Sequence, residues 1–313
     1  MDTTWDCIVV GGGAAGLSAA LVLGRARRST LLVDAGRQSN LAAHGIGGLL
    51  GSDGRPPADF YAAAHEELAA YPAVEVRSAE VVGGARDDDG FALQLEDGTR
   101  VRALRVVLAT GMDYRPPELP GVAERWGGSV FHCPFCHGWE VRERPLGVLD
   151  RGDSGARRAL LLRAWSDDVT LLADGPAELD GAAEERLRAA GVDIDERRVA
   201  ELRGAGTALS AVAFADGSER PLEGLLVPAT LHQRSPLAEQ LGAAAREPNP
   251  LAADALVTDA SQTSVPGLYA AGDLTGDMPS VVNAMAAGSR AAAMVVHDLM
   301  LPAHAPEPAA AGG

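Results

Sequence analysis

The chain has 313 residues, 47% of them hydrophobic, and a formal net charge of −16 at pH 7. This length allows two domains of ordinary size, whereas the negative charge argues against a protein that binds nucleic acid through a basic surface. Three cysteines are too few for a disulfide framework, and we expect neither a membrane-spanning apolar run nor a secretory signal. We therefore expect a cytoplasmic protein whose partners include neither nucleic acid nor a membrane.

The N-terminal segment has the pattern of a dinucleotide-binding unit. An apolar run over residues 5–10 leads into Gly11-Gly12-Gly13-Ala14-Ala15-Gly16, which fits G-x-G-x-x-G. The glycines let the backbone approach a pyrophosphate at the amino end of the next helix, which we expect over 14–27. A second apolar run ends at Asp34, where a carboxylate can accept hydrogen bonds from an adenosine ribose. A strand-end cap is the simpler role for Asp34, but the combined pattern predicts a bound dinucleotide.

A glycine-rich loop and a β-rich layer are predicted next. Residues 40–57 are rich in glycine and proline and indicate an irregular loop, and 58–71 have a helical pattern. Residues 105–111 indicate a separate buried strand that ends at a glycine. Alternating apolar and polar residues between Asp-Gly turns predict short antiparallel strands over 74–82, 91–95 and 99–103.

The middle of the chain carries a C-x-x-C in the run HCPFCH, residues 132–137. A cysteine pair at the start of a helix is typical of a redox pair, because the amino end of a helix lowers a thiol pKa. Pro134 removes a backbone donor and favours an oxidising pair. His132 and His137 are candidate bases, and we prefer His137 because it directly follows the second cysteine. A structural hydrogen bond is the simpler role for either histidine.

A second nucleotide-type loop follows, but its fingerprint is damaged. An apolar run over 146–149 leads into Asp150-Arg151-Gly152, where the first glycine of the fingerprint is replaced. The next strand, expected over 168–172, ends without a basic residue at Asp174, whose charge would repel a 2′-phosphate. The sequence therefore predicts that this loop binds no nicotinamide dinucleotide.

The C-terminal part returns to the pattern of the first segment. Apolar runs at 256–258 and 267–271 predict strands, and Gly272-Asp273 follows the second run. A long stretch of small and apolar residues predicts a helix over 281–299. Residues 301–313 are rich in proline, alanine and glycine and predict a disordered tail.

Taken in order, Gly11-x-Gly13-x-x-Gly16, Cys133-x-x-Cys136 and Gly272-Asp273 resemble the thioredoxin reductase family up to about residue 300. The resemblance implies an α/β fold of two Rossmann-like, three-layer domains and a homodimer. It implies a discontinuous FAD-binding domain, residues 1–114 and 248–300, interrupted by a degenerate nicotinamide-type domain, residues 115–247. It also implies FAD contacts from Gly11, Gly13, Ala15, Gly16, Asp34, Ala35, Thr110, Gly111, Gly272, Asp273, Asn283 and Ala284.

Two departures from that family resemble one of its subgroups. His137 stands where the reductases have an aspartate, and the second nucleotide loop is degenerate. With the block HCPFCHGWE, these features resemble the dithiol oxidases of the holomycin, gliotoxin and romidepsin pathways. The resemblance implies an FAD-dependent enzyme that oxidises a small-molecule dithiol to an intramolecular disulfide, with molecular oxygen as acceptor and hydrogen peroxide as product. It implies that Cys136 lies over the flavin and that the substrate thiolate attacks Cys133.

Other interpretations stay open at this point. If the second loop still works, the chain is an NADPH-dependent disulfide reductase of the thioredoxin reductase type, and without turnover it is an FAD-binding redox sensor. Cys133-x-x-Cys136-His137 also matches c-type haem attachment, which would require export. Zinc would need a second C-x-x-C, so we expect no metal, and the surroundings of the cysteines do not resemble a glutaredoxin.

The remaining residues of interest belong either to the core or to a possible substrate pocket. Cys7 is expected to be a small core residue of the first strand. The loop over 44–54 is a candidate wall of a substrate pocket. Four aromatic residues near the cysteines are expected to pack mainly in the core, with one or two lining a pocket for an apolar substrate: Trp126, Phe131, Phe135 and Trp139.

Overall fold

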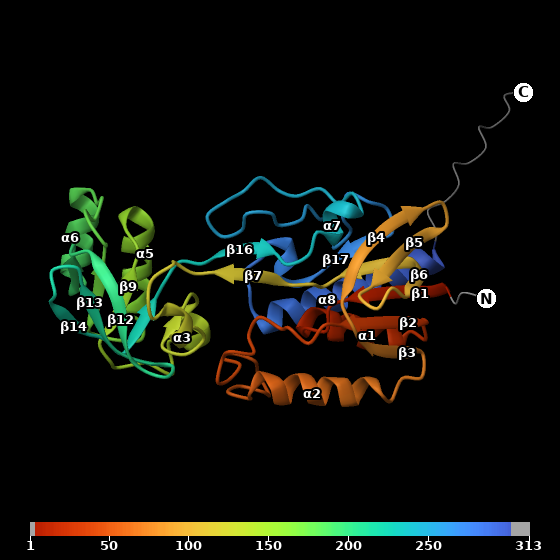
Figure 1. The fold of residues 1–313 in the computed structure, drawn as a ribbon, viewed down its shortest axis with the longest axis horizontal. Coiled ribbons are helices and arrows are strands. Elements are labelled where there is room, and N and C mark those ends of the chain that lie inside the picture. Colours follow the sequence, from red (N-terminus) through yellow and green to blue (C-terminus); the bar gives the residue numbers. More distant parts are fainter. Residues whose placement is uncertain (1–3, 302–313) are drawn as a thin grey trace, which may run out of the picture. The chain divides into compact units, whose positions relative to one another are not determined.

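The computed structural model describes residues 4–301 and divides them into two compact units (Figure 1). Unit 1 comprises residues 4–39, 58–113 and 231–301, and unit 2 comprises 40–57 and 114–230. The chain therefore returns to unit 1 at 231, where we expected 248, and the glycine-rich loop groups with unit 2. Each unit contains a parallel sheet with flanking helices, so the predicted α/β fold of two Rossmann-like units is confirmed.

Unit 1 is built on a seven-stranded sheet in the order β3-β2-β1-β6-β5-β4, with β17 also paired to β6. β1, β2, β3 and β17 join the sheet in parallel, whereas β4 and β5 are antiparallel. The strands are β1 (Thr4–Val10), β2 (Thr30–Asp34), β3 (Val74–Ser78), β4 (Val81–Asp87), β5 (Gly90–Leu95), β6 (Arg100–Leu108) and β17 (Leu268–Ala270).

Strand β6 corrects the predicted division of this region. The expected strands over 99–103 and 105–111 are one continuous strand, because Arg102 and Ala103 pair with β1 on one side and with β5 on the other. One strand thus belongs to both the parallel and the antiparallel part of the sheet. The predicted strand over 74–82 is instead divided between β3 and β4, and residues 256–258 form no strand.

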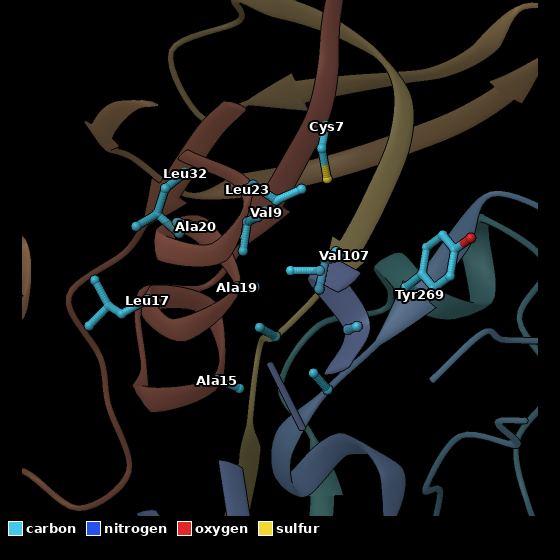
Figure 2. Packing of buried hydrophobic residues seen from close by; sticks show 14 of the residues in the cluster. Cys7, Val9, Ala15, Leu17, Ala19, Ala20, Leu23, Leu32, Val107 and Tyr269 are labelled. Atoms are coloured by element: carbon cyan, nitrogen blue, oxygen red, sulfur yellow. The ribbon is translucent and has the colours of Figure 1, made fainter. Parts of the chain in front are cut away.

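Small residues allow the helices of unit 1 to pack closely. Helix α1 (Ala14–Arg25) packs against α8 (Val281–Met300), and a Cβ atom on Gly288 would lie 1.9 Å from the carbonyl oxygen of Ala15. Figure 2 shows the adjoining core, to which β1 and β6 contribute Val9 and Val107. The other helices of unit 1 are α2 (Pro57–Leu68), α7 (Leu237–Gln240) and the 3-10 helix η1 (Gly272–Thr275).

Unit 2 has a five-stranded parallel sheet in the order β11-β10-β9-β15-β8, followed by a three-stranded antiparallel sheet of β12, β13 and β14. The strands are β8 (Val130–Phe131), β9 (Leu146–Leu149), β10 (Val169–Leu172), β11 (Val192–Asp195), β12 (Val199–Ala205), β13 (Ala208–Phe214), β14 (Glu219–Pro221) and β15 (Gly224–Leu226). The helices are α3 (Val122–Arg125), α4 (Pro134–His137), α5 (Gly152–Leu162) and α6 (Gly181–Ala189).

Strands β7 (Met112–Arg115) and β16 (Thr230–Gln233) carry the chain between the units and pair with each other, as Figure 1 shows. Neither run carries a sequence signal for this pairing, since both are short and mix polar with apolar residues. Within residues 4–301, no helix is long and apolar enough to cross a membrane. The predicted tail, 301–313, lies outside the described residues except for Leu301.

Candidate functional site

The glycine-rich turn after β1 packs so tightly that side chains cannot replace two of its glycines. Gly11 has a φ of +111°, and a Cβ atom there would lie 2.2 Å from the carbonyl oxygen of Ala109. A Cβ atom on Gly16 would lie 1.8 Å from the carbonyl oxygen of Gly11. These contacts bring β1, β6 and α1 together at the carboxyl end of the sheet, where parallel α/β sheets bind their ligands.

The third glycine of the turn faces open space. Gly13 is the N-cap residue of α1, no side chain caps the helix, and the nearest atom to a Cβ atom on Gly13 would be 3.9 Å away. Because the first N–H groups of a helix carry partial positive charge, an uncapped amino end is suited to bind an anion such as a pyrophosphate. The turn is therefore closely packed at Gly11 and Gly16 and open at Gly13.

Asp34 ends β2 beside this turn and is held in place by several donors. Its Oδ1 atom accepts the Gly36 N–H at 2.8 Å, and both carboxylate oxygens lie 3.2 Å from the Gln38 side-chain nitrogen. His65 Nε2 lies 3.3 Å from Oδ2. Sequence reasoning found Asp34 but missed Gln38 and His65, because their positions are set by the fold and by no local motif.

The C-terminal residues expected to contact FAD line a single cavity in unit 1. Gly272 has a φ of +82°, which favours glycine, and it opens η1 directly after β17. Ser280 caps α8 by accepting the Asn283 N–H at 3.2 Å, which places Asn283 in the first turn of the helix. The cavity measures about 230 Å³ and is lined by Gly272, Asp273, Asp277, Met278, Asn283, Ala284, Ala286, Ala287 and Arg290.

These features fit FAD. The turn after β1 offers an uncapped helix end for a pyrophosphate, Asp34 offers a carboxylate for a ribose, and Gly288 allows α8 to lie directly against the backbone of Ala15. Thr110 and Gly111 follow β6 at the same edge of the sheet, whereas Ala35 is exposed after β2. No residue of unit 1 contradicts the expected FAD contacts, whose individual roles stay predictions.

The cysteine pair lies at the start of α4, as the sequence predicts. Cys133 is the N-cap residue, Pro134 occupies the first turn, and the two Sγ atoms are 2.6 Å apart with both cysteines in the thiol form. The hydrogen bond from Cys136 Sγ lowers the pKa of Cys133 to about 7, against the opposing effect of burial and with help from the backbone N–H groups of Cys136 and Phe135. About half of Cys133 is therefore thiolate near neutral pH.

His132 and His137 lie in different surroundings. The His132 ring stacks on Trp126 with centroids 5.7 Å apart and tilts against Tyr114 at 4.7 Å, and burial lowers its pKa to about 4. His137 stacks on Phe131 with centroids 5.7 Å apart and an interplanar angle of 9°. Burial also lowers the pKa of His137, so both rings are neutral near pH 7.

Neither ring nitrogen of His137 has a hydrogen-bond partner of ordinary geometry among residues 4–301. Glu140 and the nearby backbone groups of Gly127 and Cys133 partly oppose the effect of burial on its pKa. A buried imidazole without a fixed partner is costly for folding and is therefore a candidate for a chemical role. This observation supports the preference for His137 over His132.

Two of the four nearby aromatic residues do not belong to the core. Phe131 is buried and Trp126 is half-buried, but 65% of Phe135 and 65% of Trp139 is exposed. Phe135 meets Trp165 edge-on at 5.3 Å, and the Arg142 guanidinium lies 3.8 Å from the centre of a Trp139 ring. Core packing, the main expectation, does not hold for Phe135 in the short helix α4 or for Trp139 just after it, and whether either lines a pocket stays a prediction. Cys7 is a core residue as predicted, and burial raises its pKa.

The second nucleotide-type loop, between β9 and α5, is closed by the protein itself. The Gly152 N–H, the first of α5, donates to the carbonyl oxygen of Ala177 at 2.8 Å. Asp150 accepts the N–H of Arg151 and the Arg158 guanidinium, both at 2.8 Å. The first N–H of α5 and the Asp150 carboxylate are therefore paired within unit 2, whereas α5, like α1, has no side-chain cap.

Asp174 is surrounded by arginines that the local sequence does not reveal. The Arg198 guanidinium lies 3.5 Å and that of Arg151 3.8 Å from its carboxylate, and the Val199 N–H donates to it at 2.9 Å. We expected no basic residue directly after β10, and the structure brings one from each of two other segments. Both arginines are held by Asp174, and Arg151 is also held by Glu178 at 3.5 Å.

No group of three or more metal-binding side chains occurs in the part of the chain that the structure describes. The observed arrangement is that of a flavin-dependent disulfide oxidoreductase: a dinucleotide cradle in one α/β unit and a thiol pair at a helix start in another. Residues 5–288 match the family described as pyridine nucleotide-disulphide oxidoreductase. The chain belongs to this family, is an oxidoreductase and uses FAD, the cofactor of the family.

Related proteins match nearly the whole chain. Thioredoxin reductase tcpT of Claviceps purpurea is 33% identical over 94% of each chain, and thioredoxin reductase sirT of Leptosphaeria maculans is 30% identical over 91% of each. The crystal structure of an oxidoreductase from Agrobacterium tumefaciens has 35% identity and a TM-score of 0.90, covering 96% of this chain and 100% of that one. The crystal structure of HlmI has 36% identity and a TM-score of 0.87, covering 96% of this chain and 95% of that one.

Proposed function

We propose that this protein is a dithiol oxidase that forms an intramolecular disulfide in a small molecule, of the kind made in natural-product biosynthesis. FAD would be its cofactor and molecular oxygen its final acceptor. The overall reaction converts one dithiol and one oxygen molecule into one disulfide and one hydrogen peroxide. The similarity to tcpT, sirT and HlmI and the block HCPFCHGWE support this class of substrate.

The closed loop before α5 is the observation that carries the proposal. A reductase of this family takes its electrons from a nicotinamide dinucleotide, which needs a free helix end for its pyrophosphate. Here the Gly152 N–H is bonded to Ala177, and the Asp174 carboxylate after the next strand is paired with Arg151 and Arg198. A protein with a thiol pair, a flavin site and no working nicotinamide site is better suited to oxidise thiols than to reduce disulfides.

The thiol pair would carry the substrate through two exchange steps. With the pair oxidised, a substrate thiolate attacks Cys133 Sγ, the Cys133–Cys136 bond breaks, and Cys136 leaves as a thiolate. The second substrate thiolate then attacks the sulfur bound to Cys133, which closes the substrate disulfide and releases the Cys133 thiolate. The backbone N–H groups of Cys136 and Phe135, which lower the pKa of Cys133, can stabilise the Cys133 thiolate as it leaves in the second step. Bound FAD supplies the two-electron acceptor that returns the pair to its disulfide.

His137 would accept the proton of a substrate thiol. Its ring is neutral near pH 7, and both ring nitrogens lack a partner of ordinary geometry, so a lone pair is available. His132 is a weaker candidate, because its ring is stacked between two aromatic side chains and its pKa of about 4 makes it a poor base at neutral pH.

An anaerobic titration tests the proposal against its main alternative. The flavin absorbance of the purified holoprotein is followed while NADPH, and in a separate sample reduced dithiothreitol, is added without oxygen. We expect dithiothreitol to bleach the flavin and NADPH to leave it unchanged. Rapid bleaching by NADPH would overturn the proposal in favour of a reductase.

Readmission of oxygen separates the oxidase from a redox sensor. We expect the flavin colour to return, one hydrogen peroxide to form per dithiol oxidised, and many dithiols to be consumed per protein. A single equivalent of oxidation without further turnover would favour an FAD-binding sensor. The expected homodimer and cytoplasmic location stay predictions, for which gel filtration with light scattering and cell fractionation are the measurements.

A further inference from the structure

We propose that Gly47 is a positioning residue for the thiol pair. At Gly47 the loop of residues 40–57 lies against the main chain of Cys136, and this contact holds the two Sγ atoms close together. This proposal rests on the proposed function for its catalytic meaning, although the geometry of the pair can be measured without any turnover. The loop contributes no sulfur, and its one histidine, His44, contacts Thr207, so the effect of the loop on the reaction would act through Cys136.

The contact between the loop and Cys136 is made by backbone on both sides. A Cβ atom on Gly47 would lie 2.6 Å from the carbonyl oxygen of Cys136, 3.2 Å from its carbonyl carbon and 3.4 Å from its Cα atom. Side chains can rotate away from such a contact, but main chain cannot do so without moving the helix that carries it. Any side chain at position 47 must therefore displace either the loop or α4.

Gly47 is not required by its own backbone conformation. Its φ lies outside the left-handed region, unlike those of its loop neighbours Gly48, Gly51 and Gly54. Alanine would be acceptable to the local backbone, and the approach to Cys136 is the obstacle to it. This contact therefore explains why the position carries glycine.

The loop is anchored well enough to act as a support. Ile46 donates to the Arg55 carbonyl oxygen at 2.9 Å and accepts the Gly54 N–H at 2.8 Å, and its side chain is buried together with that of Leu49. The loop also meets the segment that precedes the cysteines, because a Cβ atom on Gly127 would lie 3.0 Å from the Ala42 carbonyl carbon.

A further anchor comes from the antiparallel part of unit 2. His44 Nε2 lies 3.2 Å from Thr207 Oγ1, and the Thr207 carbonyl oxygen accepts the Ser129 hydroxyl at 2.6 Å. The loop is thus tied to both sides of the segment that leads into α4. A shift of the loop at Gly47 would be resisted at these anchors and transmitted to Cys136.

Cys136 supplies the hydrogen bonds that keep Cys133 acidic. Its Sγ atom and its backbone N–H both donate to Cys133, and both lower the pKa of that thiol. If Cys136 moves, these hydrogen bonds lengthen and the pKa of Cys133 rises. A rise of about one unit would reduce the thiolate fraction at pH 7 from about one half to about one tenth.

The experiment measures this thiolate directly in the reduced holoprotein. Iodoacetamide alkylation of Cys133 is followed against pH, with fragment mass spectrometry to separate Cys133 from Cys136. For Gly47→Ala we expect alkylation at pH 7 to be about 5-fold slower than in the wild type and the midpoint of the pH profile to move upward. A potential measured against glutathione buffers should change with it, whereas a merely structural role would alter only thermal stability.

Two glycines of the same loop provide matched controls. A Cβ atom on Gly45 would lie 2.7 Å from the Gly54 carbonyl oxygen, so Gly45→Ala strains the loop without touching Cys136. Gly48→Ala strains the backbone through its φ of +75°, but its Cβ atom meets nothing within 4 Å. We expect both controls to keep the wild-type alkylation profile. An unchanged profile in Gly47→Ala, or an equal change in Gly45→Ala, would overturn the proposal.

A second variant covers the case in which Gly47→Ala does not fold. Thr207→Val removes the hydroxyl that anchors His44 and leaves the loop and α4 unaltered in sequence. We expect a smaller slowing of alkylation in the same direction, about 2-fold, and no slowing would count against the proposal. The alkylation profile needs no substrate, so failure of the proposed oxidase activity would be seen separately, as wild-type protein that alkylates normally but does not turn over dithiol.

Discussion

The two nucleotide-type loops of this protein have the same local order of strand, turn and helix. They differ in whether the start of the helix is open or is paired with another part of the chain. In unit 1 the turn between β1 and α1 leaves the helix end uncapped at Gly13. In unit 2 the turn between β9 and α5 is closed, because Ala177 accepts the first helical N–H. Neither helix has a side-chain cap, so the difference lies in the first helical N–H of α5, which Ala177 takes, and in the open space at Gly13 before α1.

The aspartates that follow the next strand after each loop, Asp34 and Asp174, also differ in their partners. Asp34 after β2 is held by Gln38 and His65 beside an open turn, where it can face a ribose. Asp174 after β10 is held by Arg151 and Arg198, which makes it part of a network of ion pairs. Asp34 is the more buried of the two, with 11% of its side chain exposed against 35% for Asp174, and its contact with a ribose stays a prediction.

The largest expected effect is the loss of dithiol turnover when either cysteine of unit 2 is replaced. It tests whether unit 2 acts through its thiol pair and not through a bound nucleotide. Cys133→Ser and Cys136→Ser should each lower dithiol turnover more than about 1000-fold, because each removes one partner of the exchange, while the protein keeps its FAD. Turnover is measured as hydrogen peroxide formed, with the ratio of flavin to protein absorbance as control. Wild-type turnover in either variant would rule out the exchange mechanism.

The next test concerns the open turn of unit 1. Gly16→Ala should give protein that folds poorly and holds no FAD, since its Cβ atom would lie 1.8 Å from the Gly11 carbonyl oxygen. Gly13→Ala should leave the Tm within about 2 °C but weaken FAD binding about 10-fold, because its Cβ atom meets only the space where the pyrophosphate is expected. The measurements are thermal unfolding and FAD titration of the apoprotein. Unaltered FAD affinity in Gly13→Ala would place the cofactor elsewhere.

A third pair of variants compares the two carboxylates. Asp34→Ala should weaken FAD binding by about 10-fold or more, because a charged acceptor for the ribose is lost. Asp174→Ala should keep FAD affinity but lower the free energy of unfolding by about 1 kcal/mol, since two arginines and the Val199 N–H lose their acceptor. FAD titration and urea unfolding of both variants test this. The comparison fails if Asp174→Ala lowers FAD affinity as much as Asp34→Ala does.

The smallest expected effect is a pH dependence of stability from His132. Its pKa of about 4 in the folded protein lies below the ordinary value of 6.5, so the unfolded chain binds the proton more readily between these values. The contribution of His132 is therefore complete above pH 6.5 and is lost as the pH falls toward 4, by at most about 3 kcal/mol.

Urea unfolding at several pH values measures this contribution. His132→Phe keeps an aromatic ring beside Trp126 and should flatten the pH dependence between 4 and 6.5. Equal slopes in wild type and His132→Phe would show that His132 is not buried as a neutral ring.

The local sequence pattern was enough to predict most of the individual residues that the candidate site needs. The glycines at 11, 13 and 16, Asp34 at a strand end, and Cys133 at the start of a helix all follow from short-range rules about turns, strand ends and helix caps. The damaged loop at Asp150 was also recognisable, because a replaced glycine can be seen without knowing the fold. The long helix expected over 281–299 was confirmed nearly to the residue.

Pattern failed where one segment serves two neighbours or where distant segments meet. Strand β6 was expected as two strands, because residue alternation changes at the point where its partners change from antiparallel to parallel. Core packing was the main expectation for Phe135 and Trp139 because aromatic residues usually bury, yet both are exposed, one in α4 and one just after it. Gln38 and His65 carry no local signal for their contact with Asp34.

The sequence by itself determined the class of fold, the open turn of unit 1 and the identity of the thiol pair, because each depends on residues close together in the chain. Only the tertiary structure decided that Ala177 closes the second loop, that arginines from two segments hold Asp174, and that Gly47 lies against Cys136. These contacts join residues that are far apart in the chain, and the longest separation, between Gly47 and Cys136, is 89 positions (136 − 47). No local rule encodes such pairs, since their distance is set by how whole strands and helices pack.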